Sequence, residues 1–295
     1  MIHVSCGSYL STSLEIFLNF FQCLSSQDQT KYALHCNLQL LNNYATHAGC
    51  STKGLKVIPV DAEAKNICSA SLLSILEHAK PKDILLTLPA SKADLVFDGT
   101  TYLGHTEYFR HLWKKPELPM AFISPKFSLL LLTDHVPLNQ VTQVINQNSI
   151  CQKVNTFLNN YPEVTKIKRL IFWGINPHAG ENGQLGHEEQ EINLAIKALR
   201  IQYPQFDIIG PVASDGQFNT KFQENSQDLI ISAYHDQGLV FLKSNLGFLS
   251  TNVTFGGPFI RVSPDHGTAV ALLYKKQALY TSLLWTHELI KSWMK

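Results

Sequence analysis

Short apolar runs that end in turn-forming residues recur along the chain. They occupy residues 84–88 before Pro89, 127–133 before Asp134, 170–175 before Asn176-Pro177, and 229–233 before Tyr234. Short runs that are mainly apolar are typical of strands buried on both faces of a sheet. The pattern therefore predicts buried strands at these positions.

Helical periodicity separates several of these runs. A stripe of apolar residues at the spacing of a sheet-covering helix is formed by Ile192, Ala195, Ile196 and Leu199. Residues 267–295 indicate a helical ending. Because buried strands alternate with helices, the sequence predicts an α/β architecture containing much parallel sheet.

Length and charge narrow the class of protein. At 295 residues the chain exceeds the usual size of one hydrophobic core, which favours one large α/β domain or two lobes. The net charge is +1 and no block of like charges occurs, so the sequence argues against a nucleic-acid-binding surface and a polybasic membrane anchor. Chemistry on a small molecule is therefore favoured.

The cysteines and the first residues bear on location. The six cysteines include no C-x-x-C pair and lack metal-ligand spacing, so buried, reduced thiols are expected. The first residues lack the features of a signal peptide, and no apolar run reaches the roughly 20 residues that a membrane helix needs. We expect a cytoplasmic protein without a membrane span.

Position singles out three of the twelve histidines. His135, His178 and His235 each follow a predicted buried strand directly, and parallel sheets build their sites at the carboxyl ends of strands. Three imidazoles that converge there would hold a divalent metal and leave coordination positions open for a substrate. The alternative is a turn or packing role for each histidine, which the spacing alone does not exclude.

Two aspartates are candidates for supporting roles. Asp236 follows His235 directly, and Asp215 stands in the stretch Pro-Val-Ala-Ser-Asp-Gly. Either carboxylate could orient an imidazole or tune a bound metal. A plain turn role is the alternative, and it is favoured for Asp215 because Gly216 follows.

Other polar residues suit an anionic group. Lys243 offers a point charge and Arg261 a planar fork, with Asn252 between them in the sequence. Near His105 and Thr106, backbone amides at a helix start would suit a phosphate. The alternatives are solvated surface cations, a turn role for His105 and a helix cap for Thr106.

Six motifs connect these candidates in one order. They are Gly104-His-Thr-Glu-Tyr-Phe109, Thr133-Asp-His-Val-Pro-Leu138, Asn176-Pro-His-Ala-Gly-Glu181, Tyr234-His-Asp-Gln-Gly-Leu239, Gly257-Pro-Phe-Ile-Arg261 and Asp265-His-Gly-Thr-Ala269. In order and spacing they resemble the 4-hydroxythreonine-4-phosphate dehydrogenase family. The resemblance makes the metal-site interpretation the favoured one.

The resemblance implies an isocitrate/isopropylmalate dehydrogenase-like fold, in which two α/β lobes flank a cleft. Residues 1–100 plus 262–295 would form the first lobe, on the cofactor side. Residues 101–261 would form the second lobe, which binds metal and substrate and mediates dimerisation. A homodimer is also implied, with active sites that draw their residues, including the metal-binding histidines, from both subunits.

The resemblance assigns a role to each candidate. Metal binding falls to His135, His178 and His235. Catalytic roles fall to Asp215, Asp236 and Lys243. Substrate binding falls to His105, Thr106, Lys243, Asn252 and Arg261, with Lys243 and Arg261 on the phosphate. Cofactor binding falls to His266, Gly267, Thr268 and Ala269.

The implied reaction oxidises the C3 hydroxyl of 4-phosphooxy-threonine with NAD. The resulting β-keto acid loses carbon dioxide and gives 3-amino-2-oxopropyl phosphate for pyridoxal phosphate synthesis. NADP stays open as the cofactor, and zinc, cobalt and magnesium stay open as the one divalent metal of each site. The implied partners are thus a small phosphorylated substrate and a second subunit, with no nucleic acid and no membrane.

Three stretches depart from the family pattern. The glycine-rich opening loop, Pro-Gly-Glu-Pro-Ala-Gly-Ile-Gly-Pro-Glu in the family, is replaced by residues 5–15, where Gly7 and Glu15 stay in register. Residues 88–93 lack the glycines of a second family loop, and the family's Ala-Gly-Lys-Gly after Ala269 is also altered. Since glycines allow close backbone approach to a ligand, these changes bear mainly on cofactor binding.

Functions of different classes remain open. The intact metal and substrate positions favour an active, divergent dehydrogenase, because a scaffold has no physical need for clustered imidazoles and cations. The alternative is a degenerate enzyme that folds, dimerises and binds metal or a phosphorylated ligand without hydride transfer. A dehydrogenase for a different hydroxy acid is a third hypothesis, because the altered loops would border the substrate.

Overall fold

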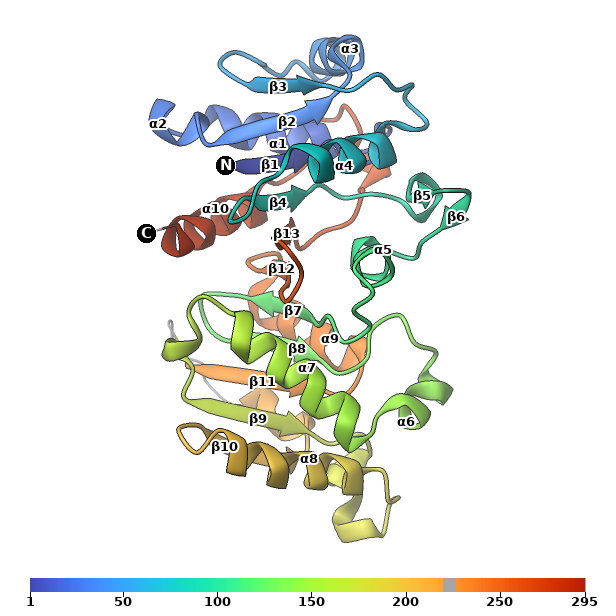
Figure 1. Ribbon diagram of the computed structural model, residues 1–295, viewed down its shortest axis with the longest axis vertical. Coiled ribbons are helices and arrows are strands. Elements are labelled where there is room, and N and C mark those ends of the chain that lie inside the picture. The colour runs from blue at the N-terminus through green and yellow to red at the C-terminus, as the bar shows by residue number, and fades with distance from the viewer. Residues whose placement is uncertain (220–226, 295) are drawn as a thin grey trace. The chain divides into compact units, whose positions relative to one another are not determined.

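The chain forms two compact units in the computed structural model, which describes residues 1–219 and 227–294. Unit 1 combines Met1–Lys115 with Gly257–Lys295, and unit 2 is Pro116–Gly256 (Figure 1). Unit 1 is therefore assembled from both ends of the chain, whereas unit 2 is continuous.

Unit 1 is built on a parallel sheet in the order β13-β4-β1-β2-β3. Its strands are β1 (Ile2–Ser5), β2 (Tyr32–Cys36), β3 (Lys56–Pro59), β4 (Ile84–Thr87) and β13 (Ile260–Pro264). Strands β1, β2 and β4 are buried along their whole length, as expected where helices cover a parallel sheet.

Helices of unit 1 pack on this sheet and on one another. Helix α4 (Ile67–His78) lies on β1 and β2, and α10 (Thr281–Trp293) lies on β13. Helix α1 (Ser13–Gln22) packs against α3 (Leu38–Ala48) and α10. The smaller elements are α2 (Ser26–Gln29), α5 (His105–Leu112), the hairpin of β5 (Val96–Phe97) and β6 (Thr100–Thr101), and the 3-10 turns η1 (Lys92–Asp94) and η6 (Val270–Leu272).

Unit 2 is built on a mixed sheet in the order β10-β9-β11-β8-β7-β12. Its strands are β7 (Met120–Ile123), β8 (Ser128–Leu131), β9 (Arg169–Trp173), β10 (Asp207–Val212), β11 (Asp228–Ser232) and β12 (Thr251–Thr254). Strands β10, β9, β11 and β8 run parallel, while β7 is antiparallel to both β8 and β12. The parallel part is the one that can gather residues at a common carboxyl edge.

Helices cover the parallel part of unit 2. Helix α9 (His235–Leu246) packs on β8 and β11, and α8 (Glu189–Gln202) packs on β10 and against α7 (Gln147–Asn160). Beneath α9, the ring of Phe241 meets Trp173 edge-on at 5.1 Å. The remaining elements are α6 (Val141–Val144) and the 3-10 turns η2 (Leu138–Gln140), η3 (Val164–Lys166), η4 (Pro177–Gly183) and η5 (Asp215–Asn219).

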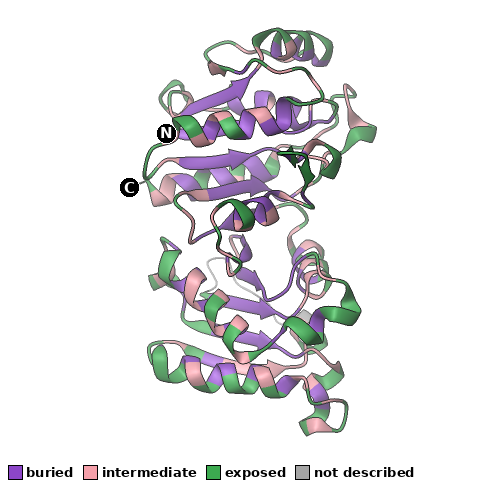
Figure 2. Cartoon of the chain, turned by 45° about the vertical axis from the view of Figure 1, so that its right-hand side comes forward, coloured by how far each residue is buried: buried purple, intermediate pink, exposed green. Residues whose placement is uncertain are grey.

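The predicted strands are confirmed at every position. They correspond to β4, β8, β9 and β11, each beginning or ending within two residues of the apolar run. The apolar stripe at residues 192, 195, 196 and 199 is buried on α8. Figure 2 shows most strands of the two main sheets as largely buried, whereas the helices carry many exposed residues.

The helical ending expected over residues 267–295 is only partly right. Helix α10 begins at Thr281, and the residues before it form a loop containing η6. Ala269, Tyr274 and Lys276 have φ values of 43°, 60° and 57°, which a right-handed helix excludes. The spacing of apolar residues did not predict these left-handed backbone angles.

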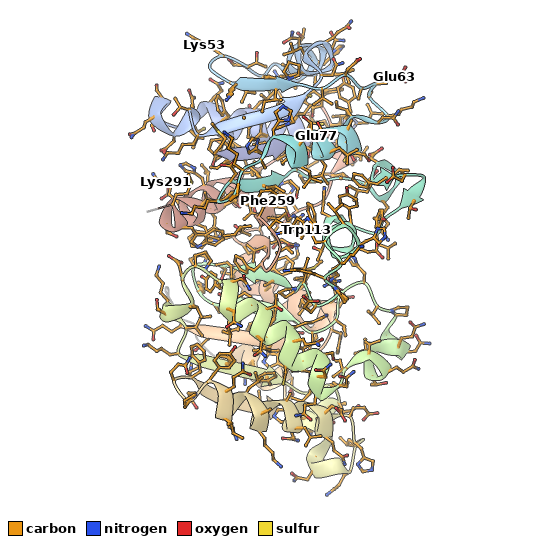
Figure 3. All side chains as sticks on the ribbon, in the orientation of Figure 1. Lys53, Glu63, Glu77, Trp113, Phe259 and Lys291 are labelled. Atoms are coloured by element: carbon orange, nitrogen blue, oxygen red, sulfur yellow. The ribbon has the colours of Figure 1, made fainter. Side chains whose placement is uncertain are left out.

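An aromatic stack closes the end of α5. The ring of Trp113, which is labelled in Figure 3, stacks on that of Phe109. The two ring centroids are 4.5 Å apart, and a Cβ atom on Gly257 would come within 2.1 Å of the Trp113 ring. Position 257 therefore requires glycine.

Across residues 1–219 and 227–294, no helix combines the length and the apolar character needed to cross a membrane.

Candidate active site

The candidate metal-binding histidines lie at one edge of the unit 2 sheet. His135 follows β8, His235 follows β11 and His178 follows β9. Strands β8, β11 and β9 are parallel neighbours, so their carboxyl ends share an edge. This placement agrees with the expectation drawn from the sequence.

Hydrogen bonds that continue past the strands bring His135 and His235 together. The N–H groups of Leu132 and Thr133 donate to the carbonyl oxygens of Ser232 and Ala233 at 2.8 and 3.1 Å. The two imidazole centroids are 5.9 Å apart. Two rings at this separation can turn their nitrogen atoms toward one ion.

The side chain of Gln237 joins the ends of β11 and β9. Its Oε1 accepts from Ala233 N–H at 2.9 Å, and its Nε2 donates to the Gly174 carbonyl oxygen at 2.8 Å. Gln237 thereby fixes both loops. Sequence reasoning assigned it no role, although it stands in the motif Tyr234-His-Asp-Gln-Gly-Leu239.

His178 lies in a left-handed turn. The residues from His178 to Asn182 all have positive φ, between 43° and 77°. For L residues this conformation costs roughly 1–2 kcal/mol per residue, so packing must hold the turn. The His178 side chain is 64% exposed, and its Nδ1 contacts Glu181 Oε1 at 2.5 Å.

The structure brings together two of the three histidines. Across the described part of the chain, no group of three or more His, Cys, Asp or Glu side chains is close enough to hold a metal ion. The donor set fits a divalent metal in chemistry, and His135 and His235 fit it in spacing. His178 shares their sheet edge without joining a three-ligand group.

The candidate aspartates differ in their contacts. Asp236 Oδ1 contacts His235 Nδ1 at 2.7 Å, an arrangement that orients the imidazole and leaves its Nε2 for another ligand. Asp215 begins η5, after strand β10, and is exposed. Because β10 is next to β9, Asp215 lies toward the same edge of the sheet.

Lys243 and Asn252 are further candidates in unit 2. Lys243 lies in the last turn of α9, with its Nζ 5.1 Å from the centroid of the Phe248 ring. Asn252 lies on β12 and pairs with Phe122 on β7. Both side chains are half-buried.

The candidate anion-binding residues of unit 1 form a buried group. Arg261 is 4% exposed, and its Nε donates to Thr87 Oγ1 at 2.8 Å. Burial lowers the pKa of Arg261 to about 9, so the guanidinium stays charged at pH 7. His105 and Thr106, at the start of α5, are also buried.

His105 is held neutral in this group. Burial, and then the nearby charge of Arg261, keep its pKa well below the ordinary value of 6.5. Its Nε2 atom has no hydrogen-bond partner among the described residues. A neutral imidazole with an unused nitrogen beside a buried cation suits an anionic ligand that can accept from both.

The candidate cofactor segment follows β13. His266 Nδ1 lies 3.0 Å from the Gly267 carbonyl oxygen, and the Thr268 carbonyl oxygen accepts from Thr12 N–H at 3.0 Å. Gly267 and Ala269 are exposed, and a Cβ atom on Gly267 would meet no atom within 4 Å. The segment therefore leaves room for a ligand.

The altered opening loop is tied to the second altered loop. Gly7 has a φ of 65°, and a Cβ atom there would come within 2.4 Å of the Pro89 carbonyl oxygen. Ser8 Oγ donates to Asp94 Oδ2 and accepts from Ser91 N–H at 2.8 Å, and Ser91 Oγ donates to the same Asp94 oxygen at 2.6 Å. Side-chain hydrogen bonds thus organise loops that glycines form in the family pattern.

Comparison with known proteins identifies the family. The family model described as pyridoxal phosphate biosynthetic protein PdxA matches residues 21–289. A 4-hydroxythreonine-4-phosphate dehydrogenase from Sulfurihydrogenibium sp. is 37% identical over 202 residues, which cover 68% of this chain and 61% of that protein. One from Helicobacter pylori is 28% identical over 300 residues, which cover 96% of each chain. The first of these matches spans less than two thirds of the relative's own length.

Solved structures support the fold. The crystal structure of 4-hydroxythreonine-4-phosphate dehydrogenase from Klebsiella pneumoniae aligns with a TM-score of 0.76 at 24% identity, covering 100% of this chain and 99% of that chain. Isocitrate dehydrogenase from Methylococcus capsulatus aligns with a TM-score of 0.50 at 12% identity, covering 99% and 85%. These alignments confirm the expected fold class, and the family match confirms the resemblance that the six motifs carry. The chain belongs to the pyridoxal phosphate biosynthetic protein PdxA family.

Proposed function

We propose that this chain is a metal-dependent, NAD-linked dehydrogenase that oxidises 4-phosphooxy-L-threonine, with decarboxylation to 3-amino-2-oxopropyl phosphate, for pyridoxal 5'-phosphate synthesis. One observation carries the proposal: three histidines follow neighbouring parallel strands of unit 2, and two of them lie 5.9 Å apart. The names of the chain's relatives supply the substrate.

His135, His178 and His235 would hold one divalent metal. When bound, the metal supplies Lewis-acid stabilisation of negative charge on the substrate oxygen during oxidation and decarboxylation. Imidazole ligands favour zinc or cobalt over magnesium, which prefers oxygen ligands. Asp236 fixes the orientation of the His235 ring, and Asp215 would support the same edge.

A homodimer with shared sites would complete the ligand set. The 5.9 Å separation of His135 and His235 supports their serving one ion from the same chain. His178 would then serve the site of the partner subunit. The described cysteines are all free thiols, as is usual in a reducing compartment such as the cytoplasm, which we propose as the location.

The residues proposed to bind the substrate are charged or polar. Arg261 and His105 in unit 1 offer a buried guanidinium and an unused imidazole nitrogen, and Thr106 adds a hydroxyl. In unit 2, Lys243 offers a cation for a phosphate and Asn252 offers an amide. Gripping the phosphate would orient the C3 hydroxyl toward the cofactor.

The cofactor would lie along His266, Gly267, Thr268 and Ala269. NAD bound there would supply the hydride acceptor for the oxidation at C3, and NADP is the second candidate. The exposed backbone at Gly267 supports close approach by a ligand. The bond from Thr12 N–H to the Thr268 carbonyl oxygen would keep this segment beside the opening loop.

The test is NADH absorbance after the purified protein is mixed with 4-phosphooxy-threonine, NAD and zinc or cobalt. We expect metal-dependent NADH formation that is lost in His135→Ala, His178→Ala and His235→Ala, together with a sharp fall in metal content. His47→Ala, at an exposed position on α3, is the matched control and should keep wild-type activity. Full metal content in all three site variants would refute the metal assignment.

A degenerate enzyme is the second candidate, favoured by the Ser8–Asp94–Ser91 bonds that replace the glycine-rich loop. It predicts metal and phosphate binding without NADH formation. Titration of NAD and NADP into metal- and substrate-loaded protein decides between the two. Absence of cofactor binding at millimolar concentration would favour the degenerate enzyme. If the protein instead used NAD to oxidise a different hydroxy acid, only the proposed substrate would be wrong.

A further inference from the structure

The carboxylate of Glu189 lies beneath the loop that carries His178. Glu189 is the first residue of α8, yet it is only 6% exposed. Its Oε1 accepts from the backbone N–H groups of Ile175 and Asn176 at 3.0 and 2.7 Å, and its Oε2 accepts from Asn176 Nδ2 at 3.0 Å. One buried carboxylate thus accepts hydrogen bonds from the backbone just after the end of β9.

Two glycines make room for this arrangement. A Cβ atom on Gly180 would lie 2.6 Å from Glu189 Oε2, and one on Gly174 would lie 2.7 Å from the Cα atom of Ala179. The left-handed turn therefore packs directly onto the carboxylate and onto the end of β9. Larger residues at either position would push the turn away.

The charge of Glu189 suits its partners. Buried backbone N–H groups beyond the end of a strand have no partner in the sheet and need other acceptors. A buried carboxylate in turn needs hydrogen-bond donors. A glutamine of the same shape would present one acceptor oxygen and an NH₂ group. Its NH₂ would face either backbone N–H groups or the Asn176 amide, so one contact would become donor against donor.

We propose that Glu189 is a positioning residue, which holds the strained turn from His178 to Asn182 so that the His178 imidazole is presented to a divalent metal. This role rests on the proposed function, because it requires His178 to be a metal ligand. In this role Glu189 is not itself a ligand of the metal. It acts through the backbone of Ile175 and Asn176.

The test compares Glu189→Gln with Glu191→Gln in the 295-residue chain. Glu191 is on the same helix, and its Oε2 accepts from the backbone N–H of Gln147 at 2.7 Å, so it is a matched carboxylate on another segment. Calorimetric titration of zinc into the metal-free protein should show affinity about 10- to 100-fold weaker for Glu189→Gln. Glu191→Gln should match wild type.

Hydrogen exchange provides a readout that does not depend on metal. In Glu189→Gln, exchange should become faster at Ile175 and Asn176 and through residues 178–183, with other segments unchanged. If Glu189→Gln fails to fold by circular dichroism, Gly180→Ala replaces it, since the added Cβ disturbs the same contact from the loop side. The same loss of zinc affinity is then expected.

The proposed metal site and the proposed role of Glu189 can be refuted separately. If wild type and His178→Ala bind zinc equally well, the proposed metal site is refuted, and the role of Glu189 with it. If His178→Ala loses zinc affinity while Glu189→Gln keeps wild-type affinity and exchange, the role of Glu189 alone is refuted.

Discussion

Burial lowers the pKa of two neighbouring residues of unit 1, with different consequences for their charge. It lowers the pKa of Arg261 to about 9, which leaves the guanidinium charged at neutral pH. It also keeps the pKa of His105 well below 6.5, with the Arg261 charge as a further cause, which leaves the imidazole neutral. One fixed cation beside one neutral imidazole is an arrangement that favours an anion over a neutral ligand.

Arg261→Gln should therefore weaken binding of phosphorylated substrate. Loss of a charge-assisted contact costs about 1.5–3 kcal/mol, and titration calorimetry with 4-phosphooxy-threonine measures it. Lys275→Gln removes an exposed cation of the same unit and serves as the control. An Arg261→Gln variant that still distinguishes phosphorylated from unphosphorylated substrate as wild type does would exclude the phosphate role.

A buried histidine pair in unit 1 should make stability depend on pH. His3 Nδ1 and His35 Nε2 are 2.8 Å apart, and His35 Nδ1 lies 2.9 Å from Ser74 Oγ. Burial lowers the pKa of His35 to about 3, and it also lowers the pKa of His3. The unfolded chain therefore binds protons that the folded chain excludes once the pH falls below 6.5.

Stability should accordingly decrease as the pH falls from 6.5 toward 3. His35→Gln should flatten this dependence by about 1–3 kcal/mol across the window, because one unit of pKa shift is about 1.4 kcal/mol. Urea denaturation at several pH values measures it, with His47→Gln on the exposed side of α3 as the control. An unchanged slope in His35→Gln would show that other groups cause the dependence.

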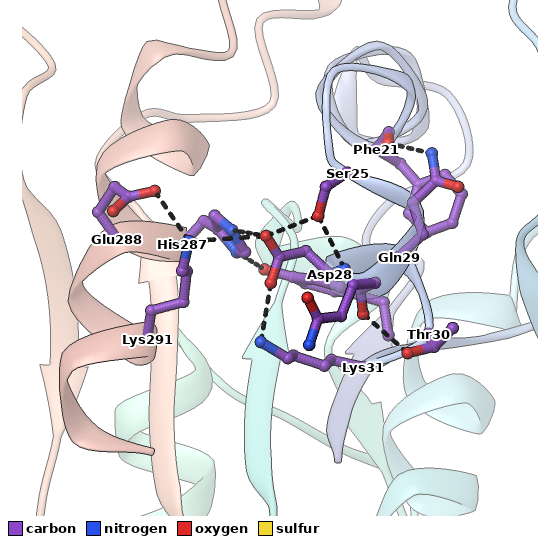
Figure 4. Close-up of polar contacts among 11 residues, drawn as sticks. Phe21, Ser25, Asp28, Gln29, Thr30, Lys31, His287, Glu288 and Lys291 are labelled. Carbon is purple, nitrogen blue, oxygen red and sulfur yellow. Dashed lines mark hydrogen bonds and ion pairs between the residues drawn. The ribbon is translucent and has the colours of Figure 1, made fainter. Parts of the chain in front are cut away.

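At the scale of elements, a polar cluster anchors α10 to the rest of unit 1. Asp28 accepts from Ser25 Oγ at 3.0 Å and Lys31 Nζ at 2.8 Å, and it lies 3.5 Å from His287 Nε2 (Figure 4). His287 Nδ1 in turn contacts the buried Tyr32 hydroxyl at 2.8 Å. The cluster ties α10 to α2 and β2, which lie far from it in the sequence.

Asp28→Asn should lower the free energy of unfolding by about 1–3 kcal/mol, since it removes a charged acceptor from several donors. Lys31 holds the pKa of Asp28 below its ordinary value of 3.8, so this contribution is present above that pH and is lost as the pH falls further. Chemical denaturation near neutral pH measures it. Glu288→Gln, which loses one exposed contact to Lys291, should change stability by less than about 0.5 kcal/mol.

The sequence predicted the buried strands because their signal is local. Short apolar runs mark β4, β8, β9 and β11 without reference to the rest of the chain. The left-handed turn at His178 had no such signal, because its conformation is imposed by Glu189, Gly174 and Gly180. The loop conformation of residues 267–280 was not predicted either, because residues with left-handed backbone angles do not change the spacing of apolar residues along the chain.

The candidate site shows the same division. The strand-end positions of His135, His178 and His235 could be read from the chain, since parallel strands share a carboxyl edge. The order β8-β11-β9, which makes the three histidines neighbours, is a long-range property that the sequence does not display. The clamping role of Gln237 also emerged only from its contacts.

At the scale of the whole molecule, mixing experiments should reveal how subunits share ligands. If His135 and His235 serve one ion from one chain, mixing inactive His135→Ala with inactive His178→Ala should restore some activity, because one intact site can form. Mixing His135→Ala with His235→Ala should restore none. Recovery in the second mixture instead of the first would show that these two histidines act from different chains.

Unit 1 also fixes an order of events during synthesis. Unit 2 is complete in the chain once residue 256 has been made, whereas the sheet of unit 1 lacks β13 until residue 264. Domains generally fold as units while the chain emerges. Unit 2 can therefore fold before β13 has been synthesised and has paired with β4 in the sheet of unit 1. Arg261 lies on β13, so its guanidinium becomes buried late in the folding of unit 1. Its hydrogen-bond partner Thr87 is synthesised much earlier.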